Sequence, residues 1–495
     1  MEAGQGREPD HGVDILDSGE AGTRYLRGGG LRFLAYGGAV AASIAATPLL
    51  TRHLHAVEYG QYVTVTSLLL IVAALTEGGI ANLGVREFSG GSERERNQLM
   101  GSLLGVRLAL SLVGSCAAIL FTALTGYPHV VVAGTAIASV VLVLANLQIT
   151  LAVPLTAGLR LPWLAALDFV GPAVTAAGLI LLVLVGASLL PFFAAGIVAY
   201  VVTVAITAAL VRHEVSIRPS FALRRWVPLL SESAVFAAAT ALGAVYFQLV
   251  VIAMSLIADG QAVGIFSLAF RILSVVNGIP LLLIGSAFPI LLRAARDDRN
   301  RLRYAIQRLL EGNLLLGGWF SLLVITTAPF AVRVMGGGGY AGSAVVLRIL
   351  GAGVPATFLA AVFAFALLAL GMYRSLIAIN AGMVVLAVAL CGTLIPSHGA
   401  HGAAISTLSL ELVLAGAYAA ALFRAHPELR PALGVPLRMI VALAVAYAIA
   451  LVAPLSSLLA AAVGTAVLAA AVVALRAVPR ELIEALRRTQ ISDAR

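Results

Sequence analysis

Long apolar stretches alternate with short polar ones over most of the chain, beginning near residue 31. A helix of about 20 apolar residues, rising about 1.5 Å per residue, crosses the ~30 Å hydrocarbon core of a bilayer. Stretches of this length, bounded by clusters of arginine, proline and glycine, predict an all-α polytopic membrane protein with about fourteen membrane-spanning helices. The predicted spans are residues 31–51, 61–83, 101–124, 130–153, 164–186, 189–211, 233–257, 265–291, 312–334, 346–370, 375–395, 401–423, 437–455 and 458–476.

The order of these spans predicts two lobes of six helices each, followed by a separate pair. The domains expected from this order are a disordered cytoplasmic tail (1–30), an N-terminal lobe (31–212), a cytoplasmic linker (213–232), a C-terminal lobe (233–424), two extra transmembrane helices (437–476) and a second cytoplasmic tail (477–495). No loop exceeds about thirty residues, so no soluble catalytic domain is expected between the helices.

Composition supports this assignment and excludes several classes of function. Hydrophobic residues make up 61% of the chain and charged residues only 11%, whereas soluble domains carry about 25% charged residues. A cytosolic enzyme and a nucleic-acid binder are therefore excluded. The chain has a net charge of +9 but contains no lysine, so it has neither a Schiff-base lysine nor a phosphate-binding loop ending in G-K-[ST]. No motif predicts a cofactor or a metal site.

The placement of arginine predicts the orientation of the chain. Cytoplasmic loops of membrane proteins are enriched in Lys and Arg. With the N-terminus in the cytoplasm, most arginines fall in cytoplasmic segments, and the outer loops and adjacent helix ends receive only Arg52, Arg333 and Arg348. Arg271 falls inside a span. This alternation predicts an even number of spans, with both termini in the cytoplasm of a cell-membrane protein.

Two segments with the same place in the predicted topology resemble each other. The first reads HAVEYGQYVTVTSLLLIVAALTEGG and the second GQAVGIFSLAFRILSVVNGIPLLLIG, so that Gly60 aligns with Gly264. Each glycine stands two residues before an aromatic residue, Tyr62 or Phe266. Both segments run from outside to inside, which predicts a parallel repeat of two halves related by an axis along the membrane normal, as in a class of secondary transporters.

Several motifs, in order along residues 31–424, resemble a known family. RHLHAVEYGQY, TEGGIANLGVREFSGG, AVGIFSLAFRI, GGGGYAGSAVVLRIL and HGAHGAAISTLSLELV resemble segments of the O-antigen and polysaccharide flippases of the multidrug/oligosaccharidyl-lipid/polysaccharide superfamily. The resemblance implies two six-helix lobes around a central cavity. It also implies a lipid-linked oligosaccharide of the polyprenyl-pyrophosphate type as substrate, with a polysaccharide polymerase and glycosyltransferases as candidate partners. Many relatives carry an acidic residue where this chain has Gln248, which places carboxylate-based coupling at that position in doubt.

Polar groups within the spans are the candidate functional residues, because charges inside a bilayer are costly. Arg271, expected about 10 Å below the outer surface, either binds an anionic substrate in the cavity or reaches back to the headgroups. Arg86 and Arg107 fit cytoplasmic anchoring at least as well as cavity binding. Glu411, near a helix centre, is a candidate ion-coupling residue or a partner for a neighbouring helix. The further candidates are Arg348, Arg52, Gln248, Asn146 and Asn277 for substrate binding and Pro280 and Pro289 for hinges.

The function predicted is translocation of lipid-linked oligosaccharide or polysaccharide repeat units by alternating access, in contact with membrane lipids and without enzymatic chemistry. Two alternatives stay open. A drug or small-cation antiporter of the same superfamily would favour deep carboxylates and an aromatic-lined cavity. A membrane glycan polymerase or ligase would need a large outer loop with catalytic polar groups, and the predicted outer loops are short.

Overall fold

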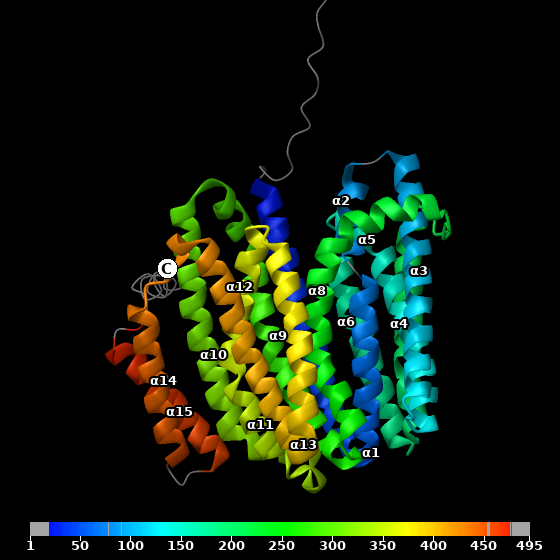
Figure 1. Cartoon of the computed structure of the whole chain (residues 1–495). Helices are drawn as coiled ribbons and strands as arrows, with labels where there is room; N and C mark the ends of the chain where they lie inside the picture. Colours follow the sequence, from blue (N-terminus) through cyan, green and yellow to red (C-terminus); the bar gives the residue numbers. More distant parts are fainter. Residues whose placement is uncertain (1–18, 78, 91, 453–455, 476, 478–495) are drawn as a thin grey trace, which may run out of the picture.

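The structure, a computed structural model, describes residues 19–77, 79–90, 92–452, 456–475 and 477, and this part of the chain is helical (Figure 1). Two short 3₁₀ helices, η2 (Gly338–Tyr340) and η3 (Pro427–Leu429), accompany the α-helices. The α-helices are α1 (Gly19–Glu77), α2 (Ile80–Gly90), α3 (Glu93–Leu124), α4 (His129–Leu151), α5 (Val153–Ala157), α6 (Leu161–Leu184), α7 (Leu189–Val211), α8 (Leu223–Ile257), α9 (Gly260–Asp297), α10 (Arg299–Gly336), α11 (Ser343–Ala352), α12 (Val354–Ala369), α13 (Tyr373–Ala425), α14 (Gly434–Val452) and α15 (Ser457–Ala474).

Among the described residues, 11 helices are long and apolar enough to cross a membrane, or 12 if α11 and α12, bent by 41°, form one span. The prediction of an all-helical, multi-pass membrane protein is therefore confirmed. The number of spans is lower than predicted because α1 and α13 each cover two of the predicted spans. Helix α13 has 53 residues, which corresponds to about 80 Å, far more than the bilayer requires.

Both long helices contain a residue with non-helical backbone angles. In α1 this residue is His55 (φ 55°, ψ −179°), and in α13 it is Gly399 (φ 52°, ψ −128°). A positive φ is readily adopted only by glycine, so the break at Gly399 falls where the sequence permits it. Gly402 packs against the backbone of Leu394, although these residues would lie about 12 Å apart along an uninterrupted helix. The two parts of α13 therefore fold back on each other at Gly399.

The helices form two groups that meet along α1. Helices α3, α4, α6 and α7 pack with α1 on one side, and α9–α13 pack together with α8 on the other. Helix α1 contacts both α8 and α9, so the junction is built from helices of both groups (Figure 1). Buried residues of both groups form one large hydrophobic cluster. A second cluster, which includes Met100, Leu103 and Leu155, fills the space among α2, α3 and α5.

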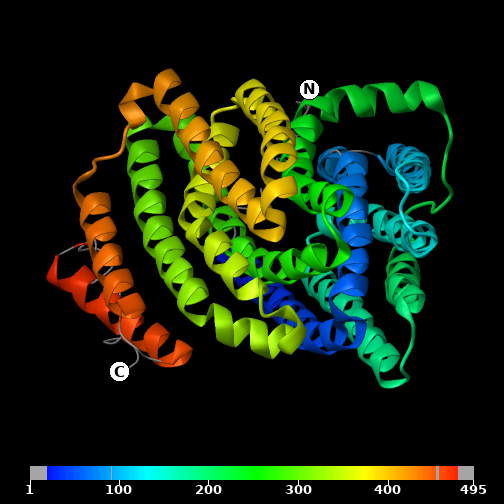
Figure 2. The ribbon, with the colours of Figure 1, turned by 60° about the horizontal axis from the view of Figure 1, so that its bottom comes forward.

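Helices α14 and α15 pack against the outer side of α10 (Figure 2). Trp319 Nε1 on α10 donates a hydrogen bond to Thr465 Oγ1 on α15 at 3.1 Å. Small residues permit close approach in lipid, and Gly318 accordingly lies against the side chain of Leu443. The apolar cluster that joins the three helices contains Leu322, Met439 and Leu468.

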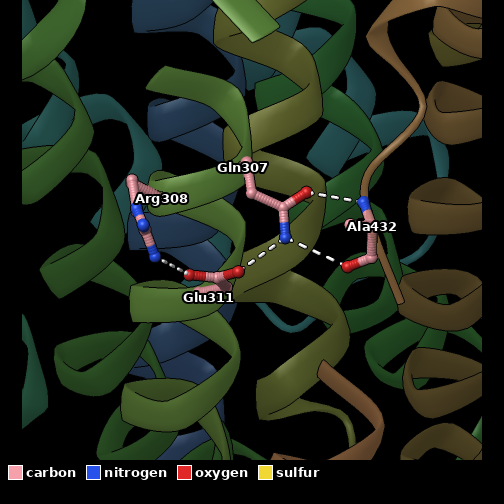
Figure 3. Close-up of polar contacts among 4 residues, drawn as sticks. All are labelled: Gln307, Arg308, Glu311 and Ala432. Carbon is pink, nitrogen blue, oxygen red and sulfur yellow. Dashed lines mark hydrogen bonds and ion pairs between the residues drawn. The ribbon is translucent and has the colours of Figure 1, made fainter. Parts of the chain in front are cut away.

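A polar clamp fixes the segment that leads into α14 (Figure 3). The side chain of Gln307 accepts a hydrogen bond from Ala432 N at 2.8 Å and donates one to Ala432 O at 3.1 Å. Gln307 Nε2 also donates to Glu311, whose other carboxylate oxygen forms an ion pair with Arg308 at 2.9 Å. The buried carboxylate of Glu311 is thus neutralised on its own helix, and the clamp joins α10 to the chain entering the last two helices.

Two expected boundaries differ from the structure. Helix α1 begins at Gly19, so residues 19–30, expected as part of a disordered tail, are helical, while residues 1–18 lie outside the described residues. The second half of the expected linker, residues 223–232, is the first part of α8. All but one residue of the expected C-terminal tail also lie outside the described part of the chain.

Candidate functional site

Arg271 lies where the two groups of helices meet. Its helix, α9, is capped by Asp259, whose side chain accepts a hydrogen bond from Ala262 N at 2.6 Å. Arg271 therefore stands about 17 Å along the helix axis from Gly260. Its exposed guanidinium donates a hydrogen bond to Ser43 Oγ on α1. Tyr59 and Tyr62, also on α1, lie close enough to interact electrostatically with Arg271.

This environment supplies a cation together with hydroxyl groups from the opposite group of helices. The side chain of Tyr62 stacks on Tyr59 with ring centroids 6.5 Å apart and on Phe193 with centroids 5.5 Å apart. No carboxylate among the described residues forms an ion pair with Arg271 that would neutralise it. Guanidinium matches phosphate in a bidentate manner, so the arrangement is suited to an anionic group.

Two of the predicted substrate-binding amides have unused hydrogen-bonding capacity. Asn277, on α9, is buried, and neither its amide nitrogen nor its oxygen has a hydrogen-bond partner among the described residues. Gln248, on α8, is half-buried, and its Oε1 is likewise without a partner in that part of the chain. Unsatisfied buried polar groups are uncommon and call for an explanation, such as a ligand or an ordered water.

The remaining predicted arginines lie elsewhere. Arg52 donates hydrogen bonds to Val334 O at 2.9 Å and Arg333 O at 3.5 Å. These carbonyls belong to the last turn of α10, where the helix dipole favours a cation. Arg52 also lines a shallow pocket with His55, Tyr340 and the glycines at 336–339. Arg348 is an exposed residue of α11. The structure does not join either residue to Arg271.

Glu411 is buried in the second part of α13, with two hydroxyl donors around its carboxylate. Thr357 Oγ1 of α12 donates to Oε2 at 2.9 Å, and the Tyr246 hydroxyl of α8 donates to Oε1 at 3.5 Å. In the part of the chain that the structure describes, no arginine or histidine forms an ion pair with it. Nearby, the Tyr418 hydroxyl donates to Asn380 Oδ1 at 2.6 Å, and Asn380 Nδ2 donates to Ala239 O at 3.0 Å.

Asn146 has a different environment from Asn277. Its amide nitrogen donates to Ser111 Oγ at 2.8 Å and to Thr76 Oγ1 at 3.1 Å. It therefore joins α4 to α3 and α1 within the first group of helices. Interhelical hydrogen bonds of this kind stabilise membrane bundles, and this use of the amide argues against a role in substrate binding.

Arg107 is a residue whose position sequence reasoning missed. From the sequence, cytoplasmic anchoring fits Arg107 at least as well as cavity binding, but its side chain is only 1% exposed. Its Nη1 donates to Thr76 O at 2.8 Å, in the last turn of α1, and its Nε donates to Thr150 Oγ1 at 3.4 Å. The sequence feature that indicates burial is the position of Arg107 several residues inside the predicted span 101–124.

The predicted hinges Pro280 and Pro289 lie within α9, which continues to Asp297. Among the described residues, non-helical backbone angles interrupt α1 at His55 and α13 at Gly399, and α11 meets α12 at a bend of 41°. The role of the two prolines stays a prediction.

Comparisons with known proteins agree with this architecture. Residues 26–295 match the family model described as "Polysaccharide biosynthesis protein". Among solved structures, "Lipid II flippase MurJ, inward closed conformation" has 13% identity and a TM-score of 0.75, covering 92% of this chain and 99% of that one. An inward-facing multidrug resistance MATE family transporter of the MOP superfamily has 13% identity and a TM-score of 0.63, covering 77% and 93%. Among curated proteins, no match was found.

Proposed function

Because the chain belongs to the polysaccharide biosynthesis protein family, we propose that it is a flippase for lipid-linked oligosaccharide or polysaccharide repeat units. It carries them across the cytoplasmic membrane by alternating access of a site between its two groups of helices. The family and the fold are those of transporters rather than enzymes. The structural likeness to a lipid II flippase and to a multidrug transporter supports an alternating-access mechanism. The substrate has to be inferred from the chemistry of the site.

The observation that carries the proposal is the exposed, uncompensated guanidinium of Arg271 at the junction of the two groups. A repeat unit on a polyprenyl carrier is anionic at its pyrophosphate, and burial of that group needs a cation with suitable hydrogen-bond donors. The unpartnered amides of Asn277 and Gln248 supply donors and acceptors for sugar hydroxyls. Arg52 and Arg348 are proposed only as outer-rim contacts.

The proposed topology completes this mechanism. The breaks at His55 and Gly399 divide α1 and α13, so that each contributes two crossings and the chain has fourteen. Two six-helix lobes, residues 31–212 and 233–424, then surround the site, and the last pair of helices lies outside them. Both termini are cytoplasmic. Glu411 is the proposed coupling site, because a carboxylate at that depth requires a proton or a metal cation for neutrality.

The test uses cells that lack this protein and any redundant flippase, complemented with variants at equal membrane abundance. Leaflet-resolved labelling measures the lipid-linked glycan on each face of the membrane. Without the protein, complete repeat units should accumulate on the cytoplasmic leaflet while their assembly continues. Arg271→Ala should reduce flipping at least about tenfold, since a hydrogen bond to a charged group contributes about 1.5–3 kcal/mol. Arg271→Lys should restore part of the activity, because it keeps the charge but loses the bidentate geometry.

The matched control is Arg94→Ala, which removes an exposed arginine near the start of α3 and should leave flipping unchanged. Unchanged outer-leaflet glycan in the deleted cells would refute the flippase. Altered drug sensitivity with normal glycan distribution would favour the antiporter instead. Full activity of Arg271→Ala would assign Arg271 to contact with lipid headgroups.

A further inference from the structure

The two repeat-related segments meet at a crossing of small residues. Helix α1 carries Ala56 and Gly60 four positions apart, and α9 carries Gly260 and Gly264 with the same spacing. These four residues are called the 56–264 crossing below. Small residues spaced by four allow two membrane helices to approach backbone to backbone. When Gly60 is aligned with Gly264, Ala56 is aligned with Gly260. The crossing therefore joins equivalent positions of the two halves.

The contacts across the 56–264 crossing are reciprocal. A methyl group on Gly60 would lie 3.0 Å from Gly264 N and 3.3 Å from Gly260 O. A methyl group on Gly264 would overlap the carbonyl group of Ala56. Gly60 thus faces the carbonyl of Gly260, and Gly264 faces the carbonyl of Ala56. Ala56 and Gly260 are equivalent in the repeat, as are Gly60 and Gly264, so the two contacts are equivalent too. Two parallel helices related by a twofold axis make this pattern only where they touch at the axis.

Further links join the two groups of helices at the same end of the bundle. The Tyr340 hydroxyl donates to Thr51 O at 3.2 Å, while Thr51 Oγ1 donates to Met335 O. The hydroxyls of Tyr127 and Ser255 share a hydrogen bond at 2.6 Å. Apart from Thr51, which lies in α1, these residues flank the turns that follow α3, α8 and α10. The 56–264 crossing is therefore the centre of a closed contact between the halves, on the side of Arg271 that faces these turns.

The 56–264 crossing differs from the helix packing inside each group in the kind of contact that has to be broken for the helices to separate. Beside the backbone contacts, the side chain of Val263 lies against Gly60 and that of Val57 against Gly260. The side chains at the crossing are therefore short, and little interdigitation has to be undone when the helices separate. Of the surrounding polar links, the one between Tyr340 and Thr51 is buried. When the helices part, its hydrogen bond would be exchanged for bonds to water, at a small net cost. The contact is built to close tightly and to part as a unit.

We propose that the 56–264 crossing is the seal of the transport pathway at this end, and that α1 and α9 separate there in every transport cycle. The inference rests on the proposed function for its substrate and adds the residues that must move. The site at Arg271 becomes accessible from this end only when the two backbones part.

A reversible covalent lock tests the seal. Cβ of Val57 lies 3.7 Å from the position of a Cβ on Gly260, within the ~3.5–4.5 Å span of a disulfide. Val57→Cys with Gly260→Cys, in a chain carrying Cys116→Ser and Cys391→Ala, should crosslink on oxidation and lose flipping at least about tenfold. Reduction should restore it, which also shows that the variant is folded.

The matched control is Gly178→Cys with Ala195→Cys, which joins α6 to α7 inside one group at the same 3.7 Å separation. This disulfide should form and leave flipping unchanged. Full flipping by the oxidised 57–260 variant would overturn the proposal.

A second measurement does not depend on the substrate. Ser43→Cys, beside Arg271, should react with a membrane-impermeant thiol reagent added on the sealed side, and the 57–260 disulfide should slow this reaction at least about tenfold. Unslowed labelling would overturn the seal. Slowed labelling in a protein that flips no glycan when reduced would refute the proposed substrate and retain the seal.

Discussion

At the scale of single residues, Glu411 and Arg271 are the two ionisable side chains on which the proposed transport mechanism depends. A carboxylate in a membrane bundle is costly unless it binds a proton or a cation. Thr357 and Tyr246 supply two neutral donors to Glu411, which position the group without neutralising it. A residue held this way can exchange a proton or a cation as its surroundings change, and this exchange could couple transport to an ion gradient.

Glu411→Gln separates this role from a structural one. Glutamine keeps the size of the side chain and an oxygen acceptor for Thr357 or Tyr246, so folding and membrane abundance should be unchanged. If Glu411 couples transport to an ion, flipping should fall about tenfold and lose its dependence on the pH or sodium gradient. The measurement is leaflet-resolved flipping at a series of imposed gradients.

The control for this prediction is Glu428→Gln. Glu428 lies in η3 outside the spans, and hydrogen bonds from its own backbone and from His426 hold its pKa below the ordinary value. Neutralising this exposed carboxylate should leave the gradient dependence intact. A Glu411→Gln protein with normal, gradient-dependent flipping would make Glu411 a purely structural hydrogen-bond acceptor.

The charged residues inside the spans can be recognised from the sequence, whereas the hydrogen-bond partners of the amides cannot. Glu411 stands out in the sequence because a lone acid near the middle of an apolar run has few explanations, and the structure places it in a buried polar cluster. Arg271 stands out in the same way, although α9 begins at Gly260, five residues before the predicted span 265–291. Asn146 and Asn277 look alike in sequence. Only the neighbouring helices show that one is satisfied and the other is not.

At the scale of elements, Arg107 joins two interrupted helices. It donates to the carbonyl of Thr76, in the last turn of α1, and to the hydroxyl of Thr150, in the last turn of α4. Both helices end there and continue after a short break as α2 and α5. Backbone carbonyls at a helix end lack partners within the helix, and a buried one requires a donor such as this guanidinium.

Arg107→Met should therefore destabilise the first group of helices. Methionine fills much of the volume but leaves the buried Thr76 carbonyl without its donor, at a cost of about 1–3 kcal/mol. The purified variant should unfold at a lower temperature, measured by a fluorescence thermal-shift assay in detergent. Arg94→Met, at an exposed position of the same helix, should unfold at the wild-type temperature. Equal melting temperatures for both variants would show that the Arg107 hydrogen bonds contribute little.

Apolar length predicted the helices well and their interruptions poorly. The runs that form α3, α6, α7, α14 and α15 are predictable because about 20 apolar side chains in a row mark a segment that can cross the bilayer, where the backbone has to satisfy its hydrogen bonds within a helix. The continuous α1 and α13 were not expected, since their turns at His55 and Gly399 are single residues rather than loops. Prolines were the expected hinges, yet α9 passes through Pro280 and Pro289, as membrane helices can when neighbours satisfy the freed carbonyls.

At the scale of the whole molecule, the internal repeat linked the sequence to the architecture. Aligning Gly60 with Gly264 predicted equivalent positions in two parallel halves. The alignment could not show that these equivalent positions touch, because contact depends on how closely the halves approach their common axis. The structure places both glycines in one crossing, where even a methyl group must displace backbone. Their identity as glycine therefore reflects the interface between halves rather than a local turn.

The arginines predict the orientation of the molecule, and reporter fusions can test this prediction. Ser188 directly precedes α7, and Ala295 lies near the end of α9. A reporter after Ser188 should be active outside the cytoplasm, and reporters after Ala295 and Arg495 should be active inside it. Arginine-rich segments stay on the cytoplasmic side, and the charged stretch 293–308 surrounds Ala295.

Two further fusions count the crossings of α13. Its N-terminal end follows Gly371 and its C-terminal end precedes Pro427. A single crossing would put these residues on opposite sides of the membrane, whereas two crossings joined at Gly399 put both on the same side. Because Gly402 packs back on Leu394, we expect reporters after Gly371 and Pro427 to be active in the cytoplasm. Opposite activities at these two positions, or a C-terminal reporter active outside, would contradict the fourteen-crossing topology and with it the cytoplasmic placement of both termini.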